Sequence, residues 1–324
     1  MKAIVCKEFG PPEKLVYEDF PLPALGKAAV RVAVKAVGVN FPDTLIIQGK
    51  YQFRAEPPFV PGGEFAGEIV EIGESIQHLK PGDPVAGVIL NGAYAEQVVA
   101  PASALLPLPK GMDFTAAAGF PMIYGTSYHA LKQRADLKSG ETLLVLGAAG
   151  GVGLAAVQLG KIMGARVIAA AGTDEKLAIC KANGADELIN YSTGSLKDQV
   201  KKLTGGKGAD VIYDPVGGEL FDQCLSCINW NGRILVVGFA GGSIPNLAIN
   251  RVLLKGCAVV GVFWGQFVMK EPQVNMANFH QLFQWYREGR LRPPVSRTYP
   301  LSAAAQAMRD LLTRTATGKL VLLP

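Results

Sequence analysis

The stretch Leu143–Gly160, LLVLGAAGGVGLAAVQLG, decides how the chain is interpreted. It contains no charged residue and is about long enough to cross a bilayer as one helix. Each of the four glycines within residues 147–153 would cost such a helix about 1 kcal/mol relative to alanine. The same glycines suit a strand that turns sharply into a helix whose unpaired amides face an anion. The stretch therefore predicts a phosphate-binding turn and argues against a membrane span.

The chain around this turn alternates between strand-like and helical segments. TLLVLG is followed by the helical VGLAAVQLGKIMG, and RVIAAA by DEKLAICKANG. Further strand-like segments are DELIN, ADVIYD, GRILVVGF and GCAVVGVFW, and the helical segments SLKDQVKKL and GELFDQCLSCI lie among them. Alternation of strands and helices is typical of a parallel, doubly wound sheet. The sequence thus predicts an α/β Rossmann domain, with the glycine turn after its first strand.

The N-terminal part of the chain follows a different pattern. Val30, Val32 and Val34 alternate with the charged Arg31 and Lys35, as in a strand that is buried on one face. KAIVCKE, AGEIVEIG and DPVAGVI are also strand-like, and few helical segments precede residue 114. This part is therefore predicted to be a separate, β-rich antiparallel unit.

The end of the second strand, AAAGTDEK, bears on which dinucleotide binds. Sites for NAD usually place a carboxylate there for the ribose hydroxyls, but this chain has Ala171 and Gly172. Asp174 comes later and is expected to cap the next helix. Thr173 and Lys176 offer a hydroxyl and a positive charge, which suit a 2′-phosphate. We therefore expect NADPH, the alternative being that Lys176 is an ordinary exposed helix residue.

Composition excludes several classes of function. The 324 residues carry a net charge of +5 without a basic stripe that is interleaved with aromatic residues, so nucleic acid is not an expected partner. Five scattered cysteines argue against a disulfide framework and for a reducing compartment. Cys224 and Cys227 form a C-x-x-C with no second pair, and we expect both to be buried on one helix face. The N-terminus lacks the pattern of a signal peptide, so a cytoplasmic protein is expected.

Together, GAAGGVG, PGGEFAGEIVEIG, YGTSYHAL and TGKLVLLP resemble the medium-chain dehydrogenase/reductase superfamily. Within it, the chain is most similar to the zinc-free NADPH:quinone oxidoreductases, the zeta-crystallin group, and to the related enoyl-thioester reductases. The resemblance runs over the whole chain. It implies a GroES-like catalytic domain at residues 1–118, completed by 266–324, and a Rossmann NADPH-binding domain at 119–265. It also implies a homodimer joined through the last Rossmann strand.

Zinc alcohol dehydrogenases differ from this sequence where they bind the metal. In place of their Cys-His pair the chain has Asn40 and Phe41, and in place of their later His-Glu pair it has Gly63 and Glu64. The four-cysteine lobe of a structural zinc site is missing as well. The sequence therefore predicts no metal.

The resemblance also assigns residues to the cofactor, each with simple packing as its alternative role. The set is Thr126, Gly150, Gly151, Val152, Gly153, Gly172, Thr173, Lys176, Tyr191, Phe239, Ala240, Phe263, Trp264, Gly265 and Arg314. Residues 150–153 would line the pyrophosphate, and 172, 173, 176 and 191 would surround the 2′-phosphate.

Two residues are expected to act on the substrate. Asn40 can donate a hydrogen bond to a developing enolate, and Tyr51 is the best proton donor, because a phenol of pKa about 10 stays protonated at neutral pH. The alternative for Tyr51 is a loop residue that only shapes the pocket. A quinone or another conjugated carbonyl is the expected acceptor. The sequence leaves open an enone or enoyl-thioester reductase, with Lys50 and Arg54 near a CoA phosphate, and a non-enzymatic NADPH-binding protein.

Overall fold

The computed structural model describes residues 1–324 and divides the chain into two compact units. The first unit comprises Met1–Met122 and Pro293–Pro324, and the second unit comprises Ile123–Arg292. The chain first passes from one unit to the other after Met122, close to the expected residue 118. It passes back only at Pro293, well beyond the expected residue 266, because two helices that we assigned to the catalytic domain belong to the second unit.

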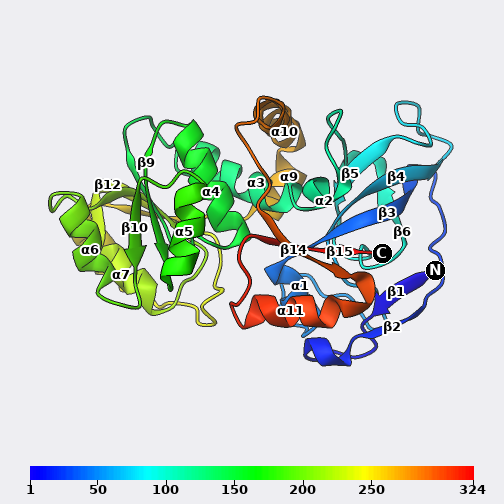
Figure 1. The fold of residues 1–324 in the computed structure, drawn as a ribbon, viewed down its shortest axis with the longest axis horizontal. Coiled ribbons are helices and arrows are strands. Elements are labelled where there is room, and N and C mark those ends of the chain that lie inside the picture. Colours follow the sequence, from blue (N-terminus) through cyan, green and yellow to red (C-terminus); the bar gives the residue numbers. More distant parts are fainter. The chain divides into compact units, whose positions relative to one another are not determined.

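The second unit is built on a parallel sheet of six strands in the order β10-β9-β8-β11-β12-β13. This is the doubly wound order of a dinucleotide-binding fold, which reverses between β8 and β11. The predicted Rossmann domain is therefore confirmed (Figure 1). The strands are β8 (Thr142–Val145), β9 (Arg166–Ala171), β10 (Glu187–Asn190), β11 (Ala209–Asp214), β12 (Ile228–Val236) and β13 (Ala258–Gly261).

Five helices connect these strands. Helices α4 and α5 pack against β8, β9 and β10, whereas α7 and α8 pack against β11 and β12. Cys224 and Cys227 are buried on α7, so the predicted packing role of this C-x-x-C is confirmed. The bounds are α4 (Gly151–Ile162), α5 (Asp174–Ala182), α6 (Leu196–Leu203), α7 (Glu219–Cys227) and α8 (Ile249–Lys255).

The other helices of the second unit explain where its end lies. Trp264 is buried against Gly125, where an added Cβ would come within 2.6 Å of the indole. Phe267 stacks on His129 with ring centroids 4.0 Å apart, and Asn278 is bonded to Gln133. These contacts attach α9 (Trp264–Lys270) and α10 (Pro272–Arg287) to α3 (Pro121–Tyr128) and the π-helical η3 (His129–Arg134).

The first unit contains a mixed sheet in the order β14-β15-β3-β4-β5-β7, with β6 also paired to β3 and with β1 and β2 in a hairpin of their own. Strand β15 runs antiparallel to β3, so the C-terminal segment returns to the N-terminal unit as expected. The strands are β1 (Lys2–Val5), β2 (Val16–Asp19), β3 (Ala29–Val39), β4 (Glu64–Ile72), β5 (Pro84–Val88), β6 (Gln97–Pro101), β7 (Leu105–Pro107), β14 (Val295–Pro300) and β15 (Lys319–Leu323).

Strand β3 shows the predicted alternation in its first half. Val30, Val32 and Val34 are buried, and their neighbours in the sequence are more exposed. From Ala36 to Val39 both faces are buried, because α2 packs against this end of the strand. The helices of the first unit are η1 (Pro12–Lys14), α1 (Phe41–Ile46), η2 (Ala102–Ala104), α2 (Phe114–Ala118), η4 (Leu301–Ala303) and α11 (Ala304–Leu312).

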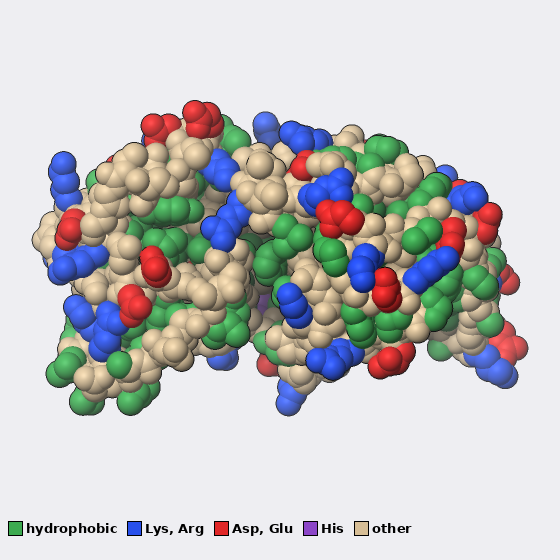
Figure 2. All heavy atoms as spheres, turned by 90° about the horizontal axis from the view of Figure 1, so that it is seen from below, with side chains coloured by type: hydrophobic (Ala, Val, Ile, Leu, Met, Phe, Trp, Pro, Cys, Tyr) green, Lys and Arg blue, Asp and Glu red, His purple; other side chains and the backbone are tan.

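The opening stretch contains a short helix and not a span. Helix α4 has 12 residues, and no helix in the structure combines the length and the apolar character that a bilayer crossing requires. On the face drawn in Figure 2, Lys and Arg side chains are interspersed with Asp and Glu, without a stripe of one sign.

Candidate functional site

The glycine turn after β8 has the geometry of a phosphate cradle. Gly147 adopts a positive φ of 54°, and the amide of Gly150 donates to its carbonyl oxygen at 3.0 Å. Gly150 is the N-cap of α4 and supplies no side chain to cap it. A Cβ on Gly153 would lie 2.4 Å from the carbonyl oxygen of Gly147, so only glycine lets the helix start this close to the turn. The first amides of α4 thus lack side-chain partners, as pyrophosphate binding requires.

The end of β9 brings together two residues that the sequence assigned to the adenosine 2′-phosphate. A Cβ on Gly172 would lie 3.4 Å from Cε2 of Tyr191 and 3.5 Å from the hydroxyl of Ser192. Tyr191 follows β10, the neighbour of β9 in the sheet. The small residue therefore leaves room beside an aromatic ring at the carboxyl edge of the parallel sheet.

The N-terminus of α5 differs from the expectation in one detail. The N-cap is Thr173, whose side chain accepts from the amide of Lys176 at 3.4 Å, and Asp174 occupies the first helical position. Asp174 therefore does not cap the helix. Its carboxylate accepts a hydrogen bond from the Asn190 side chain at 2.8 Å. The negative charge of Asp174 lies in the first turn of α5, where the helix dipole favours it.

The loops after β11 and β12 pack against each other at the same edge of the sheet. Phe239 lies beside Gly217, where an added Cβ would be 2.9 Å from the ring, and the amide of Ala240 donates to Pro215 at 3.0 Å. The buried Asp214 organises this pair of loops, because its Oδ1 accepts from the amides of Val216 and Gly217 at 2.8 Å. Burial raises the pKa of Asp214, whereas these two hydrogen bonds lower it.

Residues after β13 divide into exposed and buried. The Phe263 side chain is 51% exposed, whereas that of Trp264 is 6% exposed and donates from Nε1 to Asn275 at 3.1 Å. The Trp264 ring lies in the core against α3 and α10, so the cofactor contact that the resemblance assigns to Trp264 stays a prediction that the ring does not support. Thr126 follows Gly125 on α3, and Gly265 lies in the first turn of α9.

The first unit contains a buried polar cluster that the sequence did not predict. The Lys319 ammonium is 2% exposed and donates to Oε2 of Glu64 at 2.6 Å and to Oδ1 of Asn40. Asn40 Nδ2 in turn donates to Oε2 of Glu64 at 2.9 Å and to the carbonyl oxygen of Gly38 at 3.2 Å. Both amide hydrogens of Asn40 are thus used within the protein. Donation from this amide to a substrate remains a prediction that requires a change of partner.

Glu64 connects four segments of the first unit. Its Oε1 accepts from the amide of Met122 at 2.7 Å, while Oε2 faces Lys319 and Asn40. Gly38 is required beside it, because a Cβ there would lie 2.4 Å from Oε2 and 2.2 Å from a backbone oxygen of α2. The cluster thus joins β3, β4 and β15 to the start of α3.

A second carboxyl, Asp43, completes the cluster. Its Oδ2 accepts from the amide of Asn40 at 2.8 Å and from the hydroxyl of Tyr94 at 3.1 Å, and its side chain is buried. Its Oδ1 lies near Gly63, where an added Cβ would be 3.9 Å away. Burial raises the pKa of Asp43 to about 6, although its hydrogen bonds and Lys319 favour the charged form.

Tyr51 follows α1 and is half-buried against the apolar core of the first unit. Its hydroxyl forms no hydrogen bond within the protein. Burial raises the pKa of Tyr51, and the nearby charge of Asp43 raises it further. The phenol is therefore protonated at neutral pH and has its hydrogen bond available.

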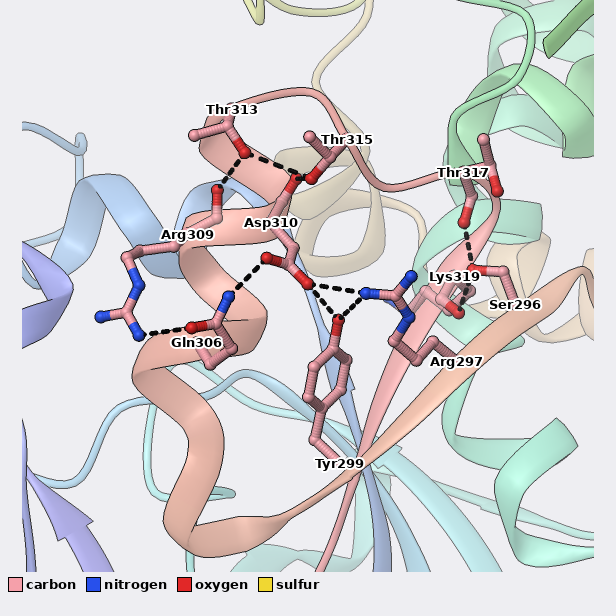
Figure 3. Close-up of polar contacts among 10 residues, drawn as sticks. All are labelled: Ser296, Arg297, Tyr299, Gln306, Arg309, Asp310, Thr313, Thr315, Thr317 and Lys319. Carbon is pink, nitrogen blue, oxygen red and sulfur yellow. Dashed lines mark hydrogen bonds and ion pairs between the residues drawn. The ribbon is translucent and has the colours of Figure 1, made fainter. Parts of the chain in front are cut away.

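Arg314 lies in the loop between α11 and β15, with a positive φ of 59°. Figure 3 shows how side chains of β14 and α11 hold this loop. Asp310 receives hydrogen bonds from Tyr299 at 2.5 Å and from Arg297 at 3.0 Å, and its carbonyl oxygen accepts from Thr315 at 3.1 Å. On the other side of Arg314, the Thr313 hydroxyl donates to the carbonyl oxygen of Arg309 at 2.9 Å, so hydrogen bonds hold the loop on both sides of this residue.

Comparisons with known proteins agree with this architecture. The family model described as alcohol dehydrogenase GroES-like domain matches residues 26–110, and that described as zinc-binding dehydrogenase matches residues 151–284. The chain is 44% identical to quinone oxidoreductase-like protein 2 homolog of Nematostella vectensis, over 99% of this chain and 88% of the relative. It is 34% identical to quinone oxidoreductase of Homo sapiens, over 100% of this chain and 98% of the relative.

The chain belongs to the quinone oxidoreductase group of the medium-chain dehydrogenase/reductase superfamily. The resemblance stated from the sequence is therefore confirmed. A solved structure of Escherichia coli quinone oxidoreductase, complexed with NADPH, matches with a TM-score of 0.95 and 30% identity, covering all of both chains. The members of this group are oxidoreductases.

The sequence of this member of the quinone oxidoreductase group did not lead us to expect that these buried polar residues form one cluster. Glu64 entered only as the residue after Gly63 in the pair compared with the His-Glu of the zinc enzymes, and Asp43, Tyr94 and Lys319 were not singled out. One signal was present in the sequence, since Lys319 begins the otherwise apolar KLVLL of β15. A charged residue in such a segment is a candidate for a buried, paired group.

Proposed function

We propose that this protein is an NADPH-dependent oxidoreductase that transfers a hydride to a quinone or a similar conjugated carbonyl. The observation that carries the proposal is the glycine cradle at the start of α4, followed by a second strand that ends in Gly172 and Thr173 instead of a carboxylate. The cradle fits a pyrophosphate, and the small residue beside Tyr191 leaves room for a phosphorylated ribose. The relative from Escherichia coli, solved with NADPH, supports the same choice.

The chain's own residues would bind the cofactor, orient the acceptor and protonate the reduced acceptor. NADPH, when bound, supplies the hydride. The amides of Gly151 and Val152 would hold the pyrophosphate, and Lys176 and Arg314 would offer positive charge to the remaining phosphate. Tyr51 would give its proton to the reduced acceptor, where conjugation has moved the negative charge onto oxygen.

We propose that the reaction needs no metal. At the positions where zinc alcohol dehydrogenases have ligands this chain has Asn40, Phe41, Gly63 and Glu64. The oxygens of Asn40 and Glu64 already accept hydrogen bonds from the Lys319 ammonium. An ammonium at this place repels a divalent cation, and it already binds the oxygen atoms that could otherwise be ligands of a metal ion. Elemental analysis of the purified protein is expected to show far less than one zinc per chain, and stoichiometric zinc that is needed for turnover would overturn this part.

The proposal is tested by cofactor oxidation against a panel of acceptors. We expect NADPH to be oxidised with quinones at a kcat/KM at least about tenfold above that with NADH, which corresponds to about 1.4 kcal/mol. Saturated ketones should not be reduced, because they cannot delocalise the developing charge. Tight NADPH binding without turnover on any acceptor would argue for a purely nucleotide-binding role.

A second candidate is the reduction of a carbon–carbon double bond in an enone or enoyl thioester. Its support is Tyr51, whose unpaired, half-buried hydroxyl suits protonation at carbon, together with Lys50 and Arg54 nearby in the chain. Both of these cations are exposed and could meet the phosphates of CoA. Enoyl-CoA substrates in the same panel decide this, since this candidate requires a kcat/KM for them above that for quinones.

We also propose that two copies pair along β13 to form a homodimer. This strand is the last in its sheet and has one unpaired edge, which a second copy can extend. Three large apolar side chains of the adjacent α8, Ile249, Leu253 and Leu254, are each at least 75% exposed. Exposed apolar groups of this kind mark protein–protein contacts.

A reducing, cytoplasmic compartment is proposed from the cysteines alone. All five are free in the structure, and four of them are buried. Fractionation of cells that express the full natural chain would test this location.

A further inference from the structure

Two buried hydroxyl groups form a hydrogen-bonded chain that reaches the first turn of α4. The Oγ atom of Ser127, on α3, lies 2.9 Å from the carbonyl oxygen of Val152 and 2.9 Å from the phenolic oxygen of Tyr213, on β11. Ser127 and Tyr213 are both fully buried. All of these residues belong to the second unit, and no step of the proposed reaction uses either hydroxyl.

The direction of these hydrogen bonds follows from the protons that are present. A carbonyl oxygen can only accept, so Ser127 gives its single hydroxyl proton to Val152. Tyr213 must then donate to the Ser127 oxygen. Burial raises the pKa of Tyr213, which keeps this phenol protonated. Because a hydroxyl that accepts a hydrogen bond becomes a stronger donor, Tyr213 strengthens the bond from Ser127 to Val152.

The Val152 carbonyl belongs to the same peptide group as the Gly153 amide. In a trans peptide the C=O and the N–H lie in one plane and point in opposite directions. The Gly153 amide lies in the first turn of α4, and it has no hydrogen-bond partner within the protein. Because Ser127 holds the carbonyl from the side of α3, it also fixes the direction in which this N–H points at the start of the helix.

Tyr213 holds the chain on the other side of the glycine turn as well. Its carbonyl oxygen accepts from the amide of Leu146 at 3.0 Å, directly before the turn. Its hydroxyl acts through Ser127 on Val152, directly after the turn. Residues 147–151 are therefore held at both ends by contacts that begin at one residue of β11.

We infer that Ser127 is a positioning residue for the cofactor pyrophosphate, because it holds the Val152–Gly153 peptide group so that the Gly153 amide faces the phosphate oxygens. This inference rests on the proposed function, which places the pyrophosphate at the start of α4. A hydrogen bond to a charged oxygen depends on direction, and a donor that is aligned before binding loses less freedom when the ligand arrives. Tyr213 supports Ser127 in this role.

The variant Ser127→Ala tests the inference, because it removes the donor to Val152. We expect the Kd for NADPH to rise about fivefold, the effect of one lost hydrogen bond. The Kd for 2′-phospho-ADP-ribose, which keeps the pyrophosphate, should rise by the same factor, whereas that for adenosine 2′-monophosphate, which lacks it, should stay unchanged. Calorimetric titration measures each ligand. The matched control is Ser226→Ala, which removes a hydroxyl bonded to a carbonyl of α7 and should leave every Kd unchanged.

A double variant separates positioning from stability. Ser127→Ala leaves the Tyr213 hydroxyl buried without an acceptor, which is destabilising, whereas Ser127→Ala combined with Tyr213→Phe removes that hydroxyl as well. The unloaded double variant should therefore unfold at a higher temperature than unloaded Ser127→Ala, and yet it should keep the raised Kd for NADPH. If the double variant regains affinity together with stability, Ser127 has only a structural role and the inference is overturned.

Failure of the proposed function gives a different result. If the unmodified protein binds neither NADPH nor 2′-phospho-ADP-ribose, the start of α4 holds no pyrophosphate, and the proposed function is overturned together with this inference. If the unmodified protein binds both and Ser127→Ala binds both equally well, only the inference is overturned. An equal loss for adenosine 2′-monophosphate would also overturn it, because this ligand has no pyrophosphate for the Gly153 amide to meet.

Discussion

At the scale of single residues, Tyr51 is the group on which the chemistry depends most. Replacing it with phenylalanine removes a hydroxyl that has no hydrogen bond within the protein, so the fold should lose little stability. We expect kcat to fall about 100-fold on enones and enoyl thioesters, with KM changed by only a few fold, since general acid catalysis contributes about this much. Steady-state kinetics check the prediction, and the exposed Tyr17→Phe is the matched control. Full activity of Tyr51→Phe would contradict the role of Tyr51 as proton donor and would leave this residue only the role of shaping the pocket.

Gly153 makes a prediction at the same scale, on binding instead of chemistry. An added methyl group would lie 2.4 Å from the carbonyl oxygen of Gly147. This oxygen belongs to the backbone of the turn, so it cannot move away from the methyl group as the end of a flexible side chain could. The start of α4 must therefore shift in Gly153→Ala, and we expect the Kd for NADPH to rise at least about tenfold. Calorimetric titration measures this. Gly26→Ala, where the nearest atom is 3.8 Å away, should bind normally, and equal affinity in the two variants would exclude the cradle.

At the scale of elements, the junction of β9 with α5 decides which cofactor is used. In Gly172→Asp the new Cβ would lie 3.4 Å from Tyr191, an ordinary contact distance, so the backbone at this junction has room for a side chain to start. Its carboxylate would repel a 2′-phosphate and accept from ribose hydroxyls. We expect kcat/KM to fall about 100-fold with NADPH and to rise with NADH. Gly172→Asn, which has similar size without the charge, separates repulsion from crowding, and a parallel loss with both cofactors in Gly172→Asp would contradict the argument.

Elements with a local pattern were predictable from the sequence, and contacts between distant segments were not. The alternation of Val30, Val32 and Val34 reports which face of β3 is buried, because strand periodicity depends only on neighbours. The glycines of residues 147–153 act in the same local way. Lys319 and Glu64, in contrast, are 255 positions apart, and their ion pair exists only because β15 returns to the sheet of β3 and β4. No periodicity carries that information.

At the scale of the whole molecule, the course of the chain between its two units was only partly predictable. The first crossing follows a change from strand-rich to helix-rich sequence, which is visible in the residues. The second depends on the burial of Trp264 and Phe267 against α3 and η3, and their apolar character alone does not tell which core they join. The cofactor residues proposed on the second unit are unaffected by this correction, because Phe263 and those before it lie within it on either boundary.

The assembly provides the last prediction. If two copies pair along β13, then Leu253, 80% exposed on α8, lies at or near the contact. A symmetric interface would receive two new charges from Leu253→Glu, and we expect the mass in solution to change from twice 34.3 kDa to that of one chain. Light scattering after size-exclusion chromatography measures it. Val70→Glu, an exposed apolar position on β4 of the first unit, should remain dimeric. Because the glycine cradle lies at the start of α4 and not on β13, the Leu253→Glu monomer should still bind NADPH. Unchanged mass in this variant would place the contact elsewhere.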